Sequence, residues 1–138
     1  MAKLKVGIVN LDAHFDLRAD QKPSSGTSFA QIARWCSQID RLFWYACLGV
    51  SEPSNTAALF DGAKRFDVKY KLDTDLDPWR LQSTLDLLHQ FVEAVDVIHL
   101  SVDLDVLSAA DMPAFSAPAP RGVPIASVEA ILGTEWRK

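Results

Sequence analysis

Acidic side chains and one imidazole gather in two short segments of the sequence. Asp12, His14 and Asp16 alternate with apolar residues, and Asp103 and Asp105 form a second alternating pair. Side chains at alternate positions of an extended chain project to the same side, so each segment presents its polar groups together. Four carboxylates in one crevice would repel one another and take up protons unless cations neutralised them. The two segments together therefore predict a cation-binding site.

The ligand types indicate which cation would bind. Carboxylate oxygens with a single imidazole suit Mn²⁺ or Mg²⁺ better than structural zinc, whose sites are commonly rich in thiolates. Carboxylates can also bridge two ions about 3.5–4 Å apart, an arrangement that activates water in hydrolytic enzymes. A binuclear hydrolytic site is the resulting hypothesis. The alternative for either motif by itself is a structural role, in which Asp12 and Asp103 cap the ends of strands and His14 is a turn residue.

Each acidic segment directly follows an apolar, β-branched run that predicts a buried strand. Strands are expected at residues 5–11, 42–50, 67–72 and 96–102, of which the third has the weakest pattern. Helices are expected around residues 28–36, 55–66, 78–94 and 125–132. Inside the last predicted strand, His99 is expected to be a hydrogen-bonded core histidine.

Strands that alternate with helices predict an α/β fold, with a parallel sheet covered by helices on both faces. Binding sites in such sheets form at the carboxyl ends of the strands, where both acidic segments are expected. The helix at residues 78–94 has the clearest start, with Asp77 as a carboxylate cap and Pro78 at the first helical position. Residues 114–124, with three prolines and a glycine, are expected to form a loop.

Composition excludes several classes of function. The 138 residues suit one compact domain, and a net charge of -4 gives no indication of nucleic-acid binding. No apolar run approaches the roughly 20 residues of a membrane span, and the N-terminal residues do not form a signal peptide. Cys36 and Cys47 lie in apolar segments without CxxC spacing, so buried thiols are favoured over a disulfide and a cytoplasmic location is predicted.

The motifs resemble those of a known enzyme family. Residues 12–18 (DAHFDLR) and 101–105 (SVDLD) resemble the two metal motifs of the ureohydrolases, the arginase and agmatinase superfamily. Residues 12–18, 24–29 (SSGTSF) and 47–56 (CLGVSEPSNT) are similar to the formimidoylglutamase branch, which hydrolyses N-formimidoyl-L-glutamate to L-glutamate and formamide in histidine degradation. The resemblance covers essentially the whole chain, and it implies a three-layer α/β/α arginase-like fold with two manganese ions.

The resemblance implies a role for each residue of the two motifs. Asp12 and Asp103 would bridge both ions, Asp16 would bind the first ion, and His14 with Asp105 would bind the second. A hydroxide shared by the ions would attack the formimidoyl carbon. Asp16 would orient this hydroxide, and Asp105 would pass a proton to the leaving nitrogen.

Substrate recognition is expected to use residues other than the predicted metal ligands. Arg18 is the last residue of the first motif, and its guanidinium would be a bidentate partner for the glutamate carboxylate. Ser25 and Asn55 are candidates for further hydrogen bonds to the substrate. Phe29 takes the place of a histidine that many arginases use for proton transfer, which argues against arginine as the substrate.

The resemblance also implies that residues 1–138 form a single partial arginase-like domain. The family takes another metal-binding histidine from a segment before the first motif and an active-site glutamate from one after the second. Neither falls within this sequence. A catalytically inactive arginase-like protein with residual metal binding is therefore the alternative function, and monomeric and homo-oligomeric forms both stay open.

A different enzyme class shares one of the motifs. Residues 98–106 (IHLSVDLDV) also resemble the nucleophile strand of haloacid-dehalogenase-type phosphotransferases. Those enzymes need a lysine and further acidic residues well downstream, and only 33 residues follow Asp105. The sequence therefore favours the ureohydrolase over the phosphotransferase.

Overall fold

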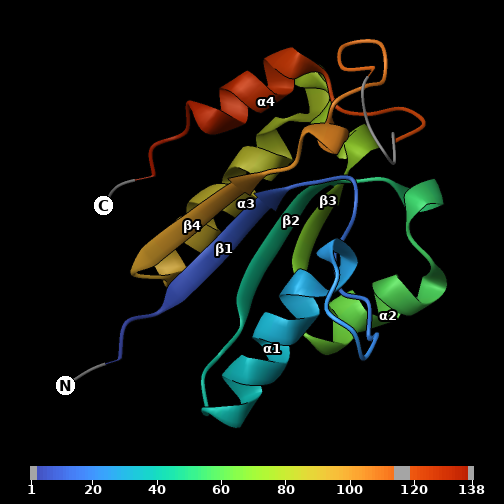
Figure 1. Cartoon of the computed structure of the whole chain (residues 1–138). Helices are drawn as coiled ribbons and strands as arrows, with labels where there is room; N and C mark the ends of the chain where they lie inside the picture. Colours follow the sequence, from blue (N-terminus) through green and yellow to red (C-terminus); the bar gives the residue numbers. More distant parts are fainter. Residues whose placement is uncertain (1–2, 114–118, 137–138) are drawn as a thin grey trace.

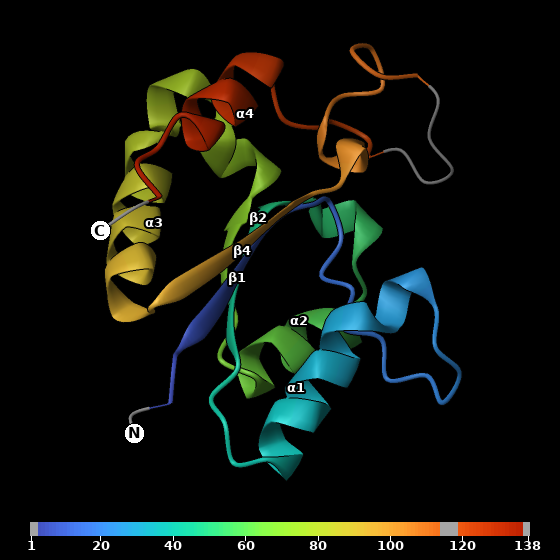
Figure 2. The same ribbon diagram turned by 60° about the vertical axis from the view of Figure 1, so that its left-hand side comes forward.

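A computed structural model describes residues 3–113 and 119–136, in which four parallel strands form one sheet in the order β3-β2-β1-β4 (Figure 1). The strands are β1 (Val6–Leu11), β2 (Trp44–Val50), β3 (Lys69–Leu72) and β4 (Val97–Val102). The helices are α1 (Ser28–Gln38), α2 (Ala57–Arg65), α3 (Gln82–Ala94) and α4 (Ile125–Leu132). Figure 2 shows α3 and α4 on one face of the sheet and α1 and α2 on the other. This arrangement confirms the predicted three-layer α/β fold.

Two apolar clusters hold the layers together. Val9 and Leu11 of β1 pack with Leu88 of α3 on one side of the sheet. Ile8 of β1 and Tyr45 of β2 belong to the cluster on the other side, beneath α1 and α2. Neighbouring residues of β1 thus enter opposite clusters, as expected for a strand that helices cover on both faces.

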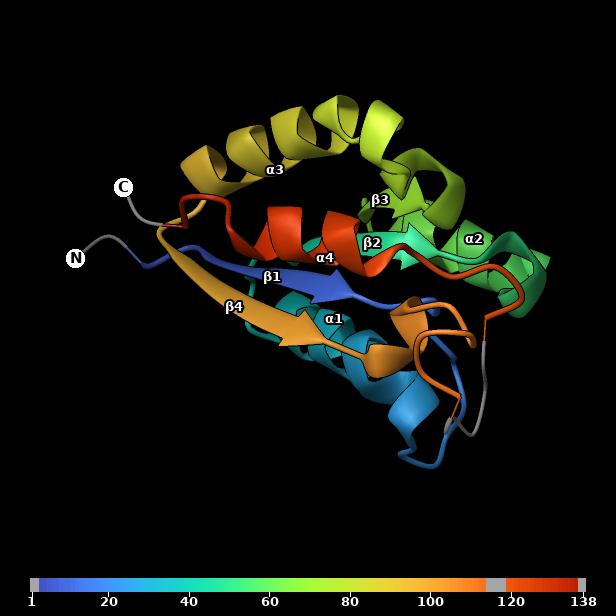
Figure 3. The same ribbon diagram turned by 90° about the horizontal axis from the view of Figure 1, so that it is seen from above.

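The pairing of β1 with β4 brings the two acidic segments together. Their register runs from Val6 opposite Val97 to Leu11 opposite Val102, and Figure 3 shows the two strands side by side. The next backbone bond continues the ladder, because Asp103 N–H donates to Leu11 O at 2.8 Å. The chain therefore leaves both strands at the same level of the sheet, immediately before the residues of each motif.

The predicted start of the third helix is wrong. Residues Pro78–Arg80 form a 3₁₀ turn, and α3 begins at Gln82. Asp77 makes no side-chain cap; its carboxylate accepts hydrogen bonds at 2.8 and 2.7 Å from the Arg121 guanidinium, which lies 44 residues later in the chain. An ion pair with a distant residue therefore replaces the expected local cap. Of the predicted loop at residues 114–124, the first five residues lie outside the described part of the chain.

His99 differs from its predicted core position, because it is exposed. Ile98 and Leu100 face the cluster near α3, so the alternation of the strand places His99 on the opposite face of β4. Both cysteines are free thiols, as predicted, although only Cys47 is fully buried and Cys36 is half-buried. Within residues 3–113 and 119–136, every helix is too short or too polar to cross a bilayer.

Candidate metal centre

Asp12, His14 and Asp105 meet at the carboxyl ends of β1 and β4. One potential ligand atom from each residue lies within 4.8 Å of the other two. His14 Nδ1 is 2.8 Å from Asp105 Oδ2 and 3.6 Å from Asp12 Oδ1. Asp12 has only 2% of its surface exposed, whereas His14 is half-buried, so solvent reaches the cluster beside the imidazole. The arrangement offers two carboxylates and one imidazole to a single cation.

Hydrogen-bonded turns fix the orientation of these side chains. His14 N–H donates to Asp12 Oδ1 at 2.8 Å, and Asp105 N–H donates to Asp103 Oδ1 at 3.0 Å, so each strand ends in a turn closed by an aspartate. Ala13 N–H donates to Asp105 Oδ1 at 3.2 Å and links the two segments directly. Asp103 and Asp105 are therefore joined by a 3₁₀ turn, Leu104–Val106, and not by the extended alternation that we predicted.

Asp16 and Asp103 lie beside this three-residue cluster. Asp16 adopts a left-handed backbone conformation with a φ of 53°, and its carbonyl accepts a hydrogen bond from Phe29 N–H at 3.2 Å. Asp103 is exposed, whereas Asp105 is 9% exposed. The charges of Asp12, Asp103 and Asp105 all raise the pKa of Asp16, so the four carboxylates share one electrostatic environment. The metal-binding roles of Asp16 and Asp103 stay predictions.

The metal-free site holds protons that a cation would displace. Burial raises the pKa of Asp12, and burial together with the Asp12 charge raises the pKa of Asp16 to about 7. Burial also acts to raise the pKa of Asp105, but hydrogen bonds from His14 and from Ala13 N–H outweigh it, and the pKa falls below its usual value. A group of carboxylates that includes Asp12 and Asp16, whose pKa values are raised without a cation, fits a hard divalent cation.

The pKa of the imidazole is also strongly shifted. Its hydrogen bonds to Asp105 and then to Asp12 raise the pKa of His14 from 6.5 to about 10. The folded-state value lies above the unfolded one. The His14 contacts therefore stabilise the metal-free fold fully below about pH 6.5, and this contribution is lost as the pH rises through about 10.

At pH 7, binding of Mn²⁺ is expected to release about one proton per chain or slightly more. His14, with its pKa of about 10, must lose a proton before a ring nitrogen can bind a cation, and Asp16, with a pKa of about 7, would release a fraction of another. Calorimetric titration in buffers of different ionisation enthalpy measures this number. The apparent affinity should keep rising with pH until about pH 10, where the metal-free His14 loses its proton, and binding without proton release would exclude His14 as a ligand.

The predicted substrate residues Arg18 and Ser25 lie in a neighbouring loop, and both are exposed. Arg18 N–H donates to Gly26 O at 3.0 Å, which closes the loop and brings the residue after Ser25 against Arg18. A Cβ atom on Gly26 would lie 3.1 Å from Arg18 Cδ, so glycine leaves room for the arginine side chain. The two candidates therefore share one exposed region, and their contacts with substrate stay predictions.

The Asn55 side chain forms hydrogen bonds with the backbone of the first motif. Its Oδ1 accepts a hydrogen bond from Phe15 N–H at 3.2 Å, and its Nδ2 donates to Ala13 O and Ser51 O, both at 2.8 Å. The side chain is 9% exposed. These contacts give Asn55 a structural role in holding the motif, while its predicted contact with substrate stays untested.

Two polar residues of the site were missed in the sequence. Asn10 and Tyr45 are buried beside Asp12, and Asn10 Nδ2 donates to both Asp12 Oδ2 and Tyr45 Oη. The available signal was an asparagine inside an otherwise apolar strand, because a buried amide is costly unless it is hydrogen-bonded. The sequence could not indicate which groups would be its partners.

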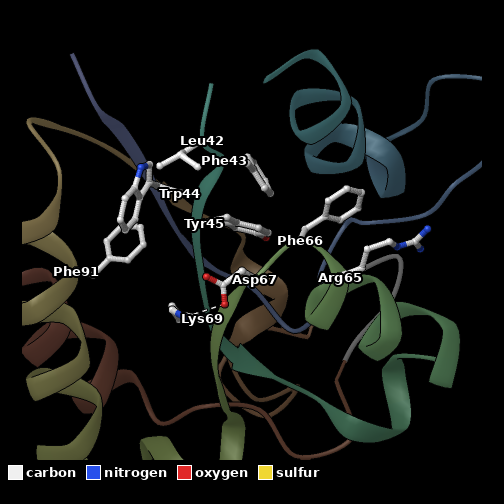
Figure 4. A pocket seen from close by; sticks show the side chains of 9 residues that line it. All are labelled: Leu42, Phe43, Trp44, Tyr45, Arg65, Phe66, Asp67, Lys69 and Phe91. Carbon is white, nitrogen blue, oxygen red and sulfur yellow. Dashed lines mark hydrogen bonds and ion pairs between the residues drawn. The ribbon is translucent and has the colours of Figure 1, made fainter. Parts of the chain in front are cut away.

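A cavity of about 240 Å³ lies at the opposite end of the sheet, where β2 and β3 begin (Figure 4). Aromatic side chains dominate its walls, with Lys69 and Asp67 paired at 2.9 Å on its rim. The lining residues are Leu42, Phe43, Trp44, Tyr45, Arg65, Phe66, Asp67, Lys69 and Phe91. None of the predicted site residues lines this cavity, so the candidate chemistry belongs to the carboxyl end of the sheet.

The fold and the cluster define an α/β protein with a carboxylate–imidazole site at the carboxyl edge of a parallel sheet. The family model of the Arginase family matches residues 1–135. The chain therefore belongs to the arginase family, and the family predicted from the two acidic motifs is confirmed.

Curated relatives named formimidoylglutamase are identical to the chain at about half of the aligned positions. The protein of Chromobacterium violaceum is 52% identical over 129 residues, covering 94% of this chain and 42% of the relative. The protein of Hahella chejuensis is 49% identical over 134 residues, covering 96% and 41%. The chain thus spans about two fifths of the length of the curated relatives that it matches.

Solved structures share the fold. Formimidoylglutamase from Bacillus subtilis has a TM-score of 0.76 at 25% identity, over 92% of this chain and 40% of that one. A Trypanosoma cruzi formiminoglutamase variant with Mn²⁺ has a TM-score of 0.74 at 22% identity, over 92% and 42%. Arginase from Bacillus caldovelox has a TM-score of 0.73 at 20% identity, over 91% and 46%. These likenesses confirm the predicted arginase-like fold.

Proposed function

We propose that this chain provides the manganese site of a cytoplasmic formimidoylglutamase, as a single partial arginase-family domain. The observation that carries the proposal is the convergence of Asp12, His14 and Asp105, with ligand atoms within 4.8 Å of one another. The relatives named formimidoylglutamase, at 52% and 49% identity, support the choice of substrate within the family. The substrate is accordingly N-formimidoyl-L-glutamate.

Five residues would hold the two Mn²⁺ ions: Asp12, His14, Asp16, Asp103 and Asp105. When bound, the ions supply positive charge that neutralises the carboxylates and lowers the pKa of a shared water. The buried position of Asp12 and the direct His14–Asp105 contact support these residues as ligands.

The chain's own residues would orient the reactants and move protons. Asp16 orients the attacking water through its carboxylate, and Asp105 carries a proton to the leaving nitrogen. The water oxygen bonds to the formimidoyl carbon, and the bond from this carbon to the glutamate nitrogen breaks. One water proton ends on the glutamate nitrogen and the other on the imino nitrogen, which becomes the NH2 group of formamide. The products are L-glutamate and formamide. Arg18, with Ser25 beside it, would hold the glutamate carboxylate.

A second function is a non-catalytic arginase-family protein that binds one cation. It is favoured by the observation that only three of the five predicted ligands converge within the described part of the chain. Elemental analysis of the Mn²⁺-loaded chain separates the two functions. Two ions per chain support the hydrolytic site, one ion supports the non-catalytic protein, and no bound ion contradicts both.

Formamide release that depends on Mn²⁺ tests the proposed reaction directly. Formimidoylglutamate should be hydrolysed in preference to arginine and agmatine, because Phe29 takes the place of the arginase histidine. Arg18→Lys keeps the charge but loses the bidentate geometry, so we expect it to raise KM about tenfold with a smaller effect on kcat. Arg34→Lys, at an exposed position of α1, is the matched control and should leave KM unchanged.

Binding of the product supplies a readout that does not need turnover. L-Glutamate titrated into the chain should bind about tenfold more weakly to Arg18→Lys than to Arg34→Lys, as measured by NMR shift changes. A preference for arginine in side-by-side assays would contradict the proposed substrate. Equal glutamate affinity in the two variants would contradict the role of Arg18.

A further inference from the structure

An asparagine lies inside the buried strand that precedes the first motif. Asn10 is 1% exposed, and its neighbours Val9 and Leu11 are fully buried. A primary amide in such a position costs free energy unless its hydrogen-bonding groups find partners. The contacts of Asn10 therefore indicate why this strand carries a polar residue at its carboxyl end.

The amide of Asn10 joins two groups of the site. Its Nδ2 donates to Asp12 Oδ2 at 3.1 Å and to Tyr45 Oη at 3.2 Å, which occupies both amide hydrogens. Tyr45 Oη in turn donates to Phe15 O at 3.1 Å, the carbonyl immediately before Asp16. The network thus bonds the first motif at a side chain and at its backbone.

Tyr45 is itself held in place by ring contacts. Its ring stacks on Phe29 at 4.5 Å between centroids and packs against Phe43 at 5.5 Å, a neighbour that also appears beside it in Figure 4. Only 1% of its surface is exposed. The hydroxyl group is therefore presented to Asn10 from a rigid part of the sheet.

This network restricts the carboxylate of Asp12. Oδ2 accepts from Asn10, and Oδ1 accepts from His14 N–H at 2.8 Å, so rotation of the carboxylate would break two hydrogen bonds in a buried site. A carboxylate oxygen can accept more than one hydrogen bond, so each oxygen of Asp12 can still bind a cation. The carboxylate is thus oriented toward His14 and Asp105 before any ion binds.

We propose that Asn10 and Tyr45 are positioning residues that orient Asp12 for metal binding, Tyr45 acting mainly through Asn10. The inference rests on the proposed metal site. Partners that orient a metal ligand commonly change affinity by about 10–100-fold when they are removed. Asn10→Leu, which removes the donor at similar size, should weaken Mn²⁺ binding by this amount. Tyr45→Phe removes one hydroxyl and should weaken it about three- to tenfold.

The experiment measures Mn²⁺ dissociation constants by the loss of the free-ion EPR signal, together with the Tm of each metal-free variant. Thr84→Val is the matched control for Tyr45→Phe, because it removes a fully buried hydroxyl that has no hydrogen-bond partner among the described residues. We expect it to change the dissociation constant less than twofold. The double variant Asn10→Leu with Tyr45→Phe should be no more than about twofold weaker than Asn10→Leu by itself, because the two residues act in one network.

The possible outcomes separate this inference from the proposed function. A purely structural role would lower the metal-free Tm of Asn10→Leu and Tyr45→Phe while leaving their Mn²⁺ dissociation constants within twofold of the unaltered chain. That result would overturn the positioning role and leave the metal site standing. If Asn10→Leu does not fold, Tyr45→Phe decides by the same criterion. Failure of the unaltered chain to bind Mn²⁺ would overturn both the metal site and this inference.

Discussion

Asp12→Asn is expected to weaken Mn²⁺ binding by at least about 100-fold. Asp12 is 2% exposed and lies among the other two converging ligands, so its loss removes a negative charge from the part of the site that solvent screens least. The amide that replaces it is a weaker ligand for a hard cation. Titration followed by the free Mn²⁺ EPR signal measures the effect.

The same substitution should leave the metal-free chain folded but with a lower Tm, because the new amide NH2 would face the Asn10 Nδ2 donor that Asp12 Oδ2 now accepts from. The amide oxygen of asparagine can still accept the hydrogen bond from His14 N–H that closes the turn. Burial disfavours the charged carboxylate of Asp12 and raises its pKa, so a neutral side chain is tolerated there without a cation. Asp61→Asn, at an exposed position of α2, is the control and should bind Mn²⁺ like the unaltered chain. Unchanged affinity in Asp12→Asn would exclude Asp12 as a ligand.

Gly49→Ala should strongly destabilise the fold near the site. Gly49 has a φ of 96°, a conformation that costs other residues about 1–3 kcal/mol. An added Cβ would lie 2.4 Å from Val106 Cγ2 and 3.2 Å from Val123 Cγ2, and overpacking of this kind costs about 1–3 kcal/mol more. We expect a combined loss of about 3 kcal/mol and a Tm lower by about 10 °C.

The steric clash in Gly49→Ala should also disturb the three-residue cluster of Asp12, His14 and Asp105. Val106 directly follows Asp105, so displacement of its side chain moves a predicted ligand, and Mn²⁺ affinity should fall with stability. Gly62→Ala in α2 is the control, because nothing lies within 4 Å of the added atom. Alanine is also the better helix former by about 1 kcal/mol, so Gly62→Ala should be neutral or stabilising. Similar melting temperatures for the two variants would contradict the steric account.

The elements of this fold could be predicted where their signals are local. The apolar runs before Asp12 and Asp103 correctly predicted β1 and β4, and α4 occupies the residues expected for the last helix. The start of α3 could not be predicted because Asp77 pairs with Arg121, a choice of partner that depends on the tertiary fold. Helix propensities and capping rules consider only residues close in sequence, so they cannot predict a contact between Asp77 and Arg121.

The candidate site shows the same division. The residue types and their positions after strands predicted that Asp12, His14 and Asp105 would meet. The turn that joins Asp103 to Asp105 and the left-handed conformation of Asp16 depend on hydrogen bonds that an alternating pattern does not encode. The contact between Asn10 and Tyr45 was missed because the two residues become neighbours only when β1 and β2 pair in register.

The β1–β4 pairing has a kinetic consequence. His14 and Asp105 are 91 residues apart in the chain, so their contact requires closure of a long loop that contains β2 and β3. Contacts of such high sequence separation slow folding, and the cluster should be among the last parts of the chain to assemble. A cation that binds only the assembled cluster would then act chiefly on the unfolding rate. Added metal should lengthen the lifetime of the native state far more than it accelerates its formation.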